Sequence, residues 1–272
     1  MRKSMQYLMA VLAIASVSVA ITSCEKDSRA RTTTPTPTVT SNSSFVEEFD
    51  NVGDLSGKGW AFVNNSSPVG QSGWRQGRYE SAAQQQYKFL APVPYLGFPA
   101  YSAHHSPNDF ISVDATAVND ALTGTGDINA WLIGPKVTIK NGDSLIFYTR
   151  AVDDANYGWY SHDRMQVRVN YNDGSADVGG STTSVGQFTT LMLDINPDYL
   201  RNDPAGNGGV EGYPRIWTKK VVKFTSVPGG IVTNARFAFR YLATDAGVFG
   251  GTGAENYPSV VGIDSLAFVH IN

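Results

Sequence analysis

The chain has 272 residues, of which 17% are charged and 11% aromatic, and its formal net charge is −3. No run rich in Lys and Arg occurs in it. Such runs neutralise phosphates when a protein binds nucleic acid, so the composition argues against a nucleic-acid partner. Cys24 is the only cysteine, so no internal disulfide can form.

The first residues have the pattern of an export signal. Arg2 and Lys3 form a positive start, and an apolar stretch from Tyr7 to Ile21 follows that is too short for a typical membrane span. The residues from Ile21 to Cys24 resemble a lipobox, although Ile and Thr stand where Leu and then Ala or Ser are commonest. We expect residues 1–23 to be a lipoprotein signal peptide and Cys24 to be acylated, which would anchor the protein to a membrane. A stray cysteine after an ordinary signal peptide is the alternative.

Loss of this leader would remove two of the 21 Lys and Arg residues, which leaves 19 against 24 acidic residues and a net charge of −5. Residues 24–44 then form the lipidated cysteine and an extended tether rich in Thr, Pro and Ser. The two residues after Cys24 are Glu25 and Lys26. The Asp that commonly retains lipoproteins in the inner membrane is therefore absent from the second position. We expect an outer-membrane lipoprotein at the cell surface, with the periplasmic face as the alternative.

Residues 45–272 read as short strands separated by turns. Asn141-Gly142 lies between two β-rich runs, 137–140 and 145–150, and predicts a β-hairpin. Apolar and polar residues alternate over 165–171 and 236–241, with Met, Val, Phe and Tyr expected to face inward. Further strand candidates are Phe45–Asp50, Ala61–Asn65, Tyr101–Ala103, Gln187–Ile195, Trp217–Phe224 and Val260–Ile271. Helix signals are nearly absent, so the sequence predicts one all-β domain, a jelly-roll β-sandwich.

Two aromatic features concern the interior and the ends of this sandwich. Trp60 and Trp74 are expected in the core. Residues 76–126 are irregular and rich in aromatic residues and proline, and we expect them to pack over one end of the sandwich. A functional loop whose rings stack on sugars is the alternative for this segment.

Short pieces along the domain resemble, in family order, the choice-of-anchor J group, which is similar to the cleaved-adhesin and MAM-like jelly-roll domains of bacterial surface proteins. This resemblance implies a non-catalytic, secreted or surface-anchored module linked to adhesion or glycan binding. The matching pieces are Glu47–Asp50, Gly59-Trp60, Trp131–Pro135, Asp163–Val167, Phe188–Leu191, Ile195–Pro197, Tyr213-Pro214, Trp217-Thr218, Phe237–Tyr241 and Gly262–Asp264.

The resemblance also implies a structural Ca²⁺ between the first and last strands, held by Glu47 and Asp264 with loop carbonyls. The sequence adds that Glu47 lies between Phe45 and Phe49 on one face of a strand. An unpaired buried carboxylate is costly, so Glu47 must meet a cation or lie at the sheet edge. For Asp264 the alternative is a carboxylate at a turn or an edge.

Catalytic motifs are missing: the sequence has no GxSxG, HExxH, P-loop or GxGxxG pattern and no usable thiol. His104-His105 is expected to be a solvated loop pair, because no third metal ligand is spaced to join it. A glycosidase needs only two carboxylates, so a hydrolase remains the least favoured alternative. We therefore expect the chain not to be an enzyme.

Two function classes remain. The first is an adhesion or carbohydrate-binding module, for which the best candidate residues are Tyr157, Trp159 and Tyr160 beside Asp153 and Asp154. Three aromatics in four residues can stack on a sugar while the carboxylates accept its hydroxyls. The second is a structural or accessory envelope lipoprotein that binds a protein partner.

Overall fold

The computed structural model describes residues 43–79, 97–119, 125–152, 161–246 and 258–271. All of them belong to the second of two compact units, Pro37–Asn272. The leader, Cys24 and most of the tether lie outside these ranges, so their processing, acylation and location stay predictions. Among the described residues no helix is long and apolar enough to cross a membrane.

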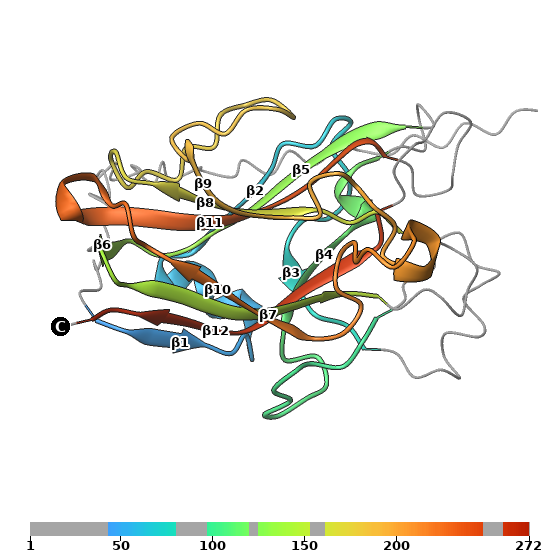
Figure 1. The fold of residues 1–272 in the computed structure, drawn as a ribbon, viewed down its shortest axis with the longest axis horizontal. Coiled ribbons are helices and arrows are strands. Elements are labelled where there is room, and N and C mark those ends of the chain that lie inside the picture. Colours follow the sequence, from blue (N-terminus) through green and yellow to red (C-terminus); the bar gives the residue numbers. More distant parts are fainter. Residues whose placement is uncertain (1–42, 80–96, 120–124, 153–160, 247–257, 272) are drawn as a thin grey trace, which may run out of the picture. The chain divides into compact units, whose positions relative to one another are not determined.

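The described strands form two antiparallel sheets that stack face to face, as Figure 1 shows. In the first sheet the strand order is β10-β7-β12-β4-β3, and β1 also pairs with β12. Its strands are β1 (Phe45–Glu47), β3 (Arg75–Gln76), β4 (Ile111–Asp114), β7 (Ser144–Ala151), β10 (Thr218–Lys223) and β12 (Val260–Val269).

The second sheet has the order β2-β5-β11-β8-β9, and β6 also pairs with β11. Its strands are β2 (Ala61–Asn64), β5 (Gly126–Ile133), β6 (Val137–Lys140), β8 (Met165–Asn170), β9 (Thr190–Ile195) and β11 (Ile231–Ala246). The predicted all-β jelly-roll sandwich is therefore confirmed.

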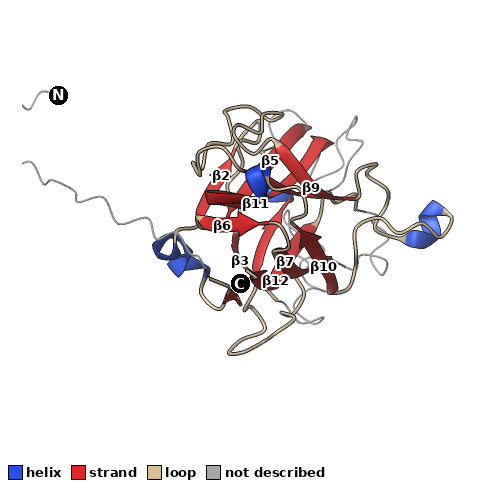
Figure 2. Cartoon of the chain, turned by 60° about the vertical axis from the view of Figure 1, so that its left-hand side comes forward, coloured by secondary structure: helices blue, strands red, loops and turns tan. Residues whose placement is uncertain are grey.

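Helical turns are short and lie in the connections between strands (Figure 2). They are the 3₁₀ turns η1 (Val52–Lys58), η2 (Ala115–Ala117), η5 (Pro204–Asn207) and η6 (Pro228–Gly230). The scarcity of helix signals in the sequence is thus matched in the described residues.

Aromatic side chains fill the space between the two sheets. Phe147 of β7 meets Phe239 of β11 edge to face, with ring centroids 4.9 Å apart. Trp60 is buried between Phe49 and Phe237, both 5.8 Å away. Together with Trp74 it belongs to the main buried cluster, which confirms both tryptophans as core residues. Rings in edge-to-face contact add stability beyond their buried area.

The longest strand of each sheet changes its partner along one side. β12 pairs with β4 near its start and with β1 near its end, and the register shifts between them. Ser265 lies in that shift with φ 44°. β11 likewise pairs first with β6 and then with β5, and Asn234 lies in its shift with φ 62°. Such bulges re-aim neighbouring side chains, and the one in β12 sets the position of Asp264.

The hairpin predicted at Asn141-Gly142 is wrong. The turn forms, because the Asp143 N–H donates to the Lys140 carbonyl at 3.1 Å and Gly142 has φ 100°. However, β6 pairs with β11 in the second sheet, whereas β7 pairs with β10 and β12 in the first. The turn carries the chain from one sheet to the other, because turn residues set the reversal of direction but not the partner of each strand.

Long connections cover the outer faces of both sheets. Phe98 and Phe110 pack with Val260 over the first sheet, and Val178 and Phe188 pack over the second. The alternation of β8 placed Gln166, Arg168 and Asn170 on the outward face, yet Gln166 and Asn170 are buried and Arg168 is partly buried. In the irregular segment 76–126 the predicted short strand over 101–103 is wrong, since those residues form a bend, and strand β4 was missed.

Candidate functional site

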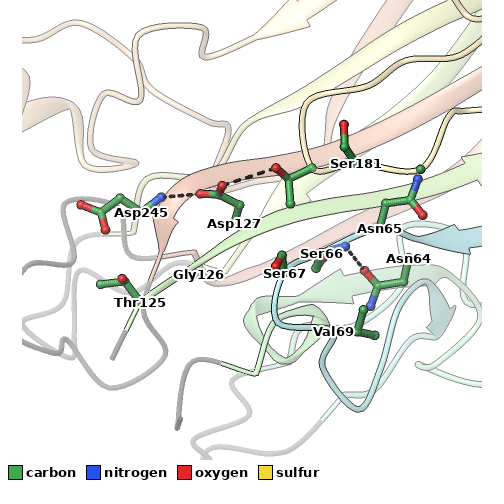
Figure 3. Close-up of a pocket in the computed structure, with 12 residues that line it drawn as sticks. Asn64, Asn65, Ser66, Ser67, Val69, Thr125, Gly126, Asp127, Ser181 and Asp245 are labelled. Carbon is green, nitrogen blue, oxygen red and sulfur yellow. Dashed lines mark hydrogen bonds between the residues drawn. The ribbon is translucent and has the colours of Figure 1, made fainter. Parts of the chain in front are cut away.

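An open pocket of about 680 Å³ lies where one end of the second sheet meets a loop, as Figure 3 shows. The end of β2, the start of β5 and the end of β11 meet there with the loop 180–182. Most of its lining residues are hydroxyl, amide or carboxylate side chains. They are Asn64, Asn65, Ser66, Ser67, Val69, Thr125, Gly126, Asp127, Gly180, Ser181, Thr182 and Asp245.

Asp127 is held in place at this pocket by hydrogen bonds. The Asp245 N–H donates to Asp127 Oδ1 at 3.0 Å, and the Thr182 hydroxyl donates to Oδ2 at 3.4 Å. Two backbone hydrogen bonds with Ser67 fix the main chain of Asp127 as well. A carboxylate has about four acceptor sites, so this one keeps capacity for further donors.

The wall of the pocket is also fixed before any ligand arrives. The Asn64 side-chain amide donates to the Ser72 and Ala117 carbonyls at 2.7 and 2.8 Å. The Asn65 amide donates to the Gly179 carbonyl at 2.7 Å. Because these amides are anchored to the backbone, the pocket needs little ordering to bind a ligand.

The residues predicted for ligand binding, Asp153, Asp154, Tyr157, Trp159 and Tyr160, lie outside the described residues. Their role stays a prediction. The pocket residues were missed because they come from four separate segments, and none of those segments has a local motif. The sequence offered one weak signal for the pocket, the carboxylate of Asp127 directly before an apolar run.

A stacked pair of aromatic rings, one exposed and one partly buried, lies on the outer face of the first sheet. Tyr101 stacks on Tyr148 with ring centroids 3.7 Å apart, and Tyr101 is 46% exposed. Trp217 meets Tyr101 at a steep angle with centroids 6.4 Å apart. Tyr101 belongs to the irregular segment 76–126, for which a sugar-stacking loop was the alternative, and its partial exposure leaves it within reach of a ligand.

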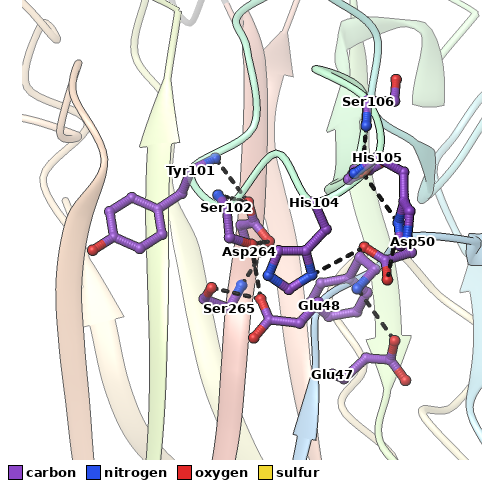
Figure 4. A network of polar contacts seen from close by, with 12 residues as sticks. Glu47, Glu48, Asp50, Tyr101, Ser102, His104, His105, Ser106, Asp264 and Ser265 are labelled. Atoms are coloured by element: carbon purple, nitrogen blue, oxygen red, sulfur yellow. Dashed lines mark hydrogen bonds and ion pairs between the residues drawn. The ribbon is translucent and has the colours of Figure 1, made fainter.

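The structure does not join Glu47 to Asp264. Lys58 Nζ lies 2.9 and 3.2 Å from the two Glu47 oxygens, so the predicted need of Glu47 for a cation is met by a lysine. Successive residues of a strand point to opposite faces, and it is Glu48 that approaches Asp264. The Ser102 and Ser265 hydroxyls donate to Glu48 at 2.8 and 2.6 Å, as Figure 4 shows.

Asp264 is enclosed by backbone donors rather than oxygen ligands. The N–H groups of Tyr101 and Ser102 donate to Oδ2 at 2.8 and 3.1 Å, and the Ser265 N–H donates to Oδ1 at 2.7 Å. A Ca²⁺ ion takes six to eight oxygen ligands. The described arrangement of Glu47 and Asp264 therefore does not fit a shared Ca²⁺, and a structural Ca²⁺ elsewhere stays a prediction.

Stability should fall as the pH rises from about 4 to about 6, and Asp264→Asn should flatten this decline. Burial raises the pKa of Asp264 to about 6, against partial compensation by the N–H groups of Ser102, Ser265 and Tyr101. In the unfolded chain the carboxyl ionises near pH 4, so between these values only the unfolded state loses its proton. Urea unfolding at pH 4, 5 and 6 measures the slope. The exposed Asp198→Asn is the matched control, and an unchanged slope in Asp264→Asn would contradict this account.

No protein-family model matches the sequence, and no curated protein matches it either. Among solved structures the chain is similar to two cleaved adhesin domains of Lys-gingipain, the first of them from Porphyromonas gingivalis. One is 16% identical with a TM-score of 0.46 and covers 85% of this chain and 100% of that one. The other is 17% identical with a TM-score of 0.41 and covers 83% and 97%.

A third similar structure is TmCBM61, solved in complex with β-1,4-galactotriose. It is 8% identical with a TM-score of 0.34, and the match covers 82% of this chain and 99% of that one. At these identities none of the similarities assigns a ligand or an activity to this chain.

Proposed function

We propose that this chain is a non-catalytic glycan-binding module, held at an outer membrane through acylated Cys24. The observation that carries the proposal is the pocket of about 680 Å³ whose lining is mostly hydroxyl, amide and carboxylate groups. Its volume falls within the range of small-molecule sites. Sugar hydroxyls donate and accept hydrogen bonds together, and a fixed carboxylate such as Asp127 accepts two of them.

Two surfaces add to the proposal. The predicted platform of Tyr157, Trp159 and Tyr160 would offer aromatic rings on which a sugar stacks. The exposed ring of Tyr101, stacked on Tyr148, offers a separate aromatic surface on the first sheet. Variants at Asp127, Trp159 and Tyr101 therefore distinguish three places where a glycan would bind.

We expect the purified segment 45–272 to bind a defined set of glycans on an array, and Asp127→Ala to weaken that binding at least about tenfold. One or two lost hydrogen bonds to a charged group account for a change of this size. Asp127→Asn keeps one acceptor oxygen and should lose less. Asp198→Ala removes an exposed carboxylate that does not line the pocket, and it should bind as the wild type does.

Other outcomes would redirect the proposal. Loss of binding in Trp159→Ala or Tyr101→Ala alone would move the site from the pocket to that surface. Binding that requires added Ca²⁺ would support the predicted Ca²⁺. Silence across a broad array, with and without Ca²⁺, would favour the accessory lipoprotein and a protein partner in the envelope. Release of reducing sugar from a bound glycan would contradict a non-catalytic role.

A further inference from the structure

A loop across the first sheet brings two histidines to two aspartates. His104 and His105 lie in the bend 101–105, where neighbouring side chains need not point to opposite faces as they do in a strand. Both rings face Asp50, which follows β1. His104 Nδ1 lies 3.6 Å from Asp50 Oδ1, and His105 Nδ1 lies 3.6 Å from Oδ2. The third ligand that the sequence spacing did not reveal is thus supplied from a distant segment.

Asp109 completes the group from the other end of the same loop. His105 Nδ1 lies 3.9 Å from Asp109 Oδ2. The ligand atoms of Asp50, His105 and Asp109 all lie within 4.8 Å of one another, as Figure 4 shows in part. One imidazole and two carboxylates therefore converge on a single point, with His104 beside them.

The separations between these atoms suit shared coordination better than direct hydrogen bonding. A nitrogen–oxygen distance of 3.6 to 3.9 Å is too long for a protein hydrogen bond. Two ligand atoms bound to Zn²⁺ at about 2.0–2.1 Å with tetrahedral geometry lie about 3.4 Å apart. Small side-chain rotations would bring these groups onto one ion.

Asp109 is oriented for this role before any ion binds. Its side chain is only 5% exposed, and the N–H groups of His105 and Ser106 donate to its Oδ2 at 2.6 and 2.7 Å. Within the described ranges, the ion pairs of Asp50 and Asp109 are with the two histidines alone. The two neighbouring carboxylates carry like charges, and a bound cation would offset their repulsion.

We propose that Asp50, His105 and Asp109 bind a divalent transition-metal ion of the Zn²⁺ class, with His104 available as a fourth ligand. Mixed imidazole and carboxylate ligands suit Zn²⁺ rather than Ca²⁺, which takes oxygen ligands alone. The ion would fasten the loop that carries Tyr101 and Ser102 to the segment after β1. This proposal does not depend on glycan binding.

The test uses the full chain, purified in detergent and stripped with a chelator that is then removed. Co²⁺ titration followed by visible absorption should show one equivalent of bound ion, which Zn²⁺ displaces and Ca²⁺ in 100-fold excess does not. His105→Gln should weaken binding at least about tenfold, as loss of a ligand requires. This side chain is 76% exposed, so the fold should survive, and circular dichroism checks that it does.

Asp50→Asn should weaken Co²⁺ binding to a similar degree, whereas the exposed neighbour Asp54→Asn should leave it unchanged. The absence of any metal-dependent absorption would overturn the proposal. So would wild-type affinity in His105→Gln, because the ion would then be held elsewhere on the chain. Displacement of Co²⁺ by Ca²⁺ would contradict the assigned class of metal.

Discussion

Replacing Asp163 with leucine should lower the free energy of unfolding by about 4 kcal/mol, because several buried donors lose their acceptor. Asp163 is 1% exposed. It accepts hydrogen bonds from the Tyr241 hydroxyl at 2.6 Å and from Asn202 Nδ2 at 2.7 Å. The Ser259 N–H and hydroxyl donate to it at 2.9 and 2.5 Å. This one carboxyl thus joins β11, the loop at 202 and the approach to β12, and urea unfolding at pH 7 measures its contribution.

Asp163→Asn is the matched control, since the amide oxygen still accepts some of these hydrogen bonds, and we expect a loss of about 1 kcal/mol. Burial raises the pKa of Asp163 above its usual range. Above about pH 4 the unfolded chain loses this proton before the folded one does, so wild-type stability declines as the pH rises. The penalty of Asp163→Asn should therefore be smaller at pH 7 than at pH 3. A leucine variant within 1 kcal/mol of wild type would show that the network is dispensable.

Arg236→Met should cost about 3 kcal/mol, through the loss of hydrogen bonds to three backbone carbonyls. Arg236 is 8% exposed. Its Nε donates to the Gly174 carbonyl at 2.9 Å, and one terminal nitrogen donates to the Gly59 and Gly134 carbonyls at 2.9 and 2.7 Å. The guanidinium group thus joins three separate segments, because its several N–H donors reach a carbonyl in each of them.

Thermal unfolding checks this second prediction, with Lys223→Met as the control because that lysine is exposed on the edge strand β10. Methionine keeps most of the apolar stem of arginine, so the difference reports the lost donors rather than lost packing. Burial lowers the pKa of Arg236, yet the group stays charged at neutral pH. Equal midpoints for the two variants would show that water replaces the guanidinium at no cost.

The sequence predicted the inner face of the sandwich well, because alternation is a local signal. Phe237, Phe239 and Tyr241 face the core as expected, and so do Met165 and Val167. Partner choice is not local, and the turn at 141–142 shows this, since its two flanking strands join different sheets. The outer faces were misjudged for a related reason. The polar side of a strand is expected to face water, and the strand's own sequence does not show which loop packs over it.

The candidate sites, too, combine features set by the local sequence with features set by the fold. Glu47 was expected to meet a cation or to lie at the sheet edge, and it pairs with Lys58. It is Glu48 that approaches Asp264, because the bulge at Ser265 and the pleat of β1 set which side chains meet. The pocket around Asp127 and the group around His105 each combine residues from segments far apart in the chain. The spacing of residues along the sequence does not show that such segments lie close together.

The pairing of β1 with β12 has a consequence for biogenesis. Phe45 lies opposite Phe268 in that ladder, so the first strand finds its place only when nearly the whole domain has been made. Contacts between such distant segments form slowly, since the intervening chain must be ordered first. A chain exported from its amino end would therefore stay open while it threads through a translocation channel. If the predicted export takes place, this order of strands would keep the domain from closing before it has crossed the membrane.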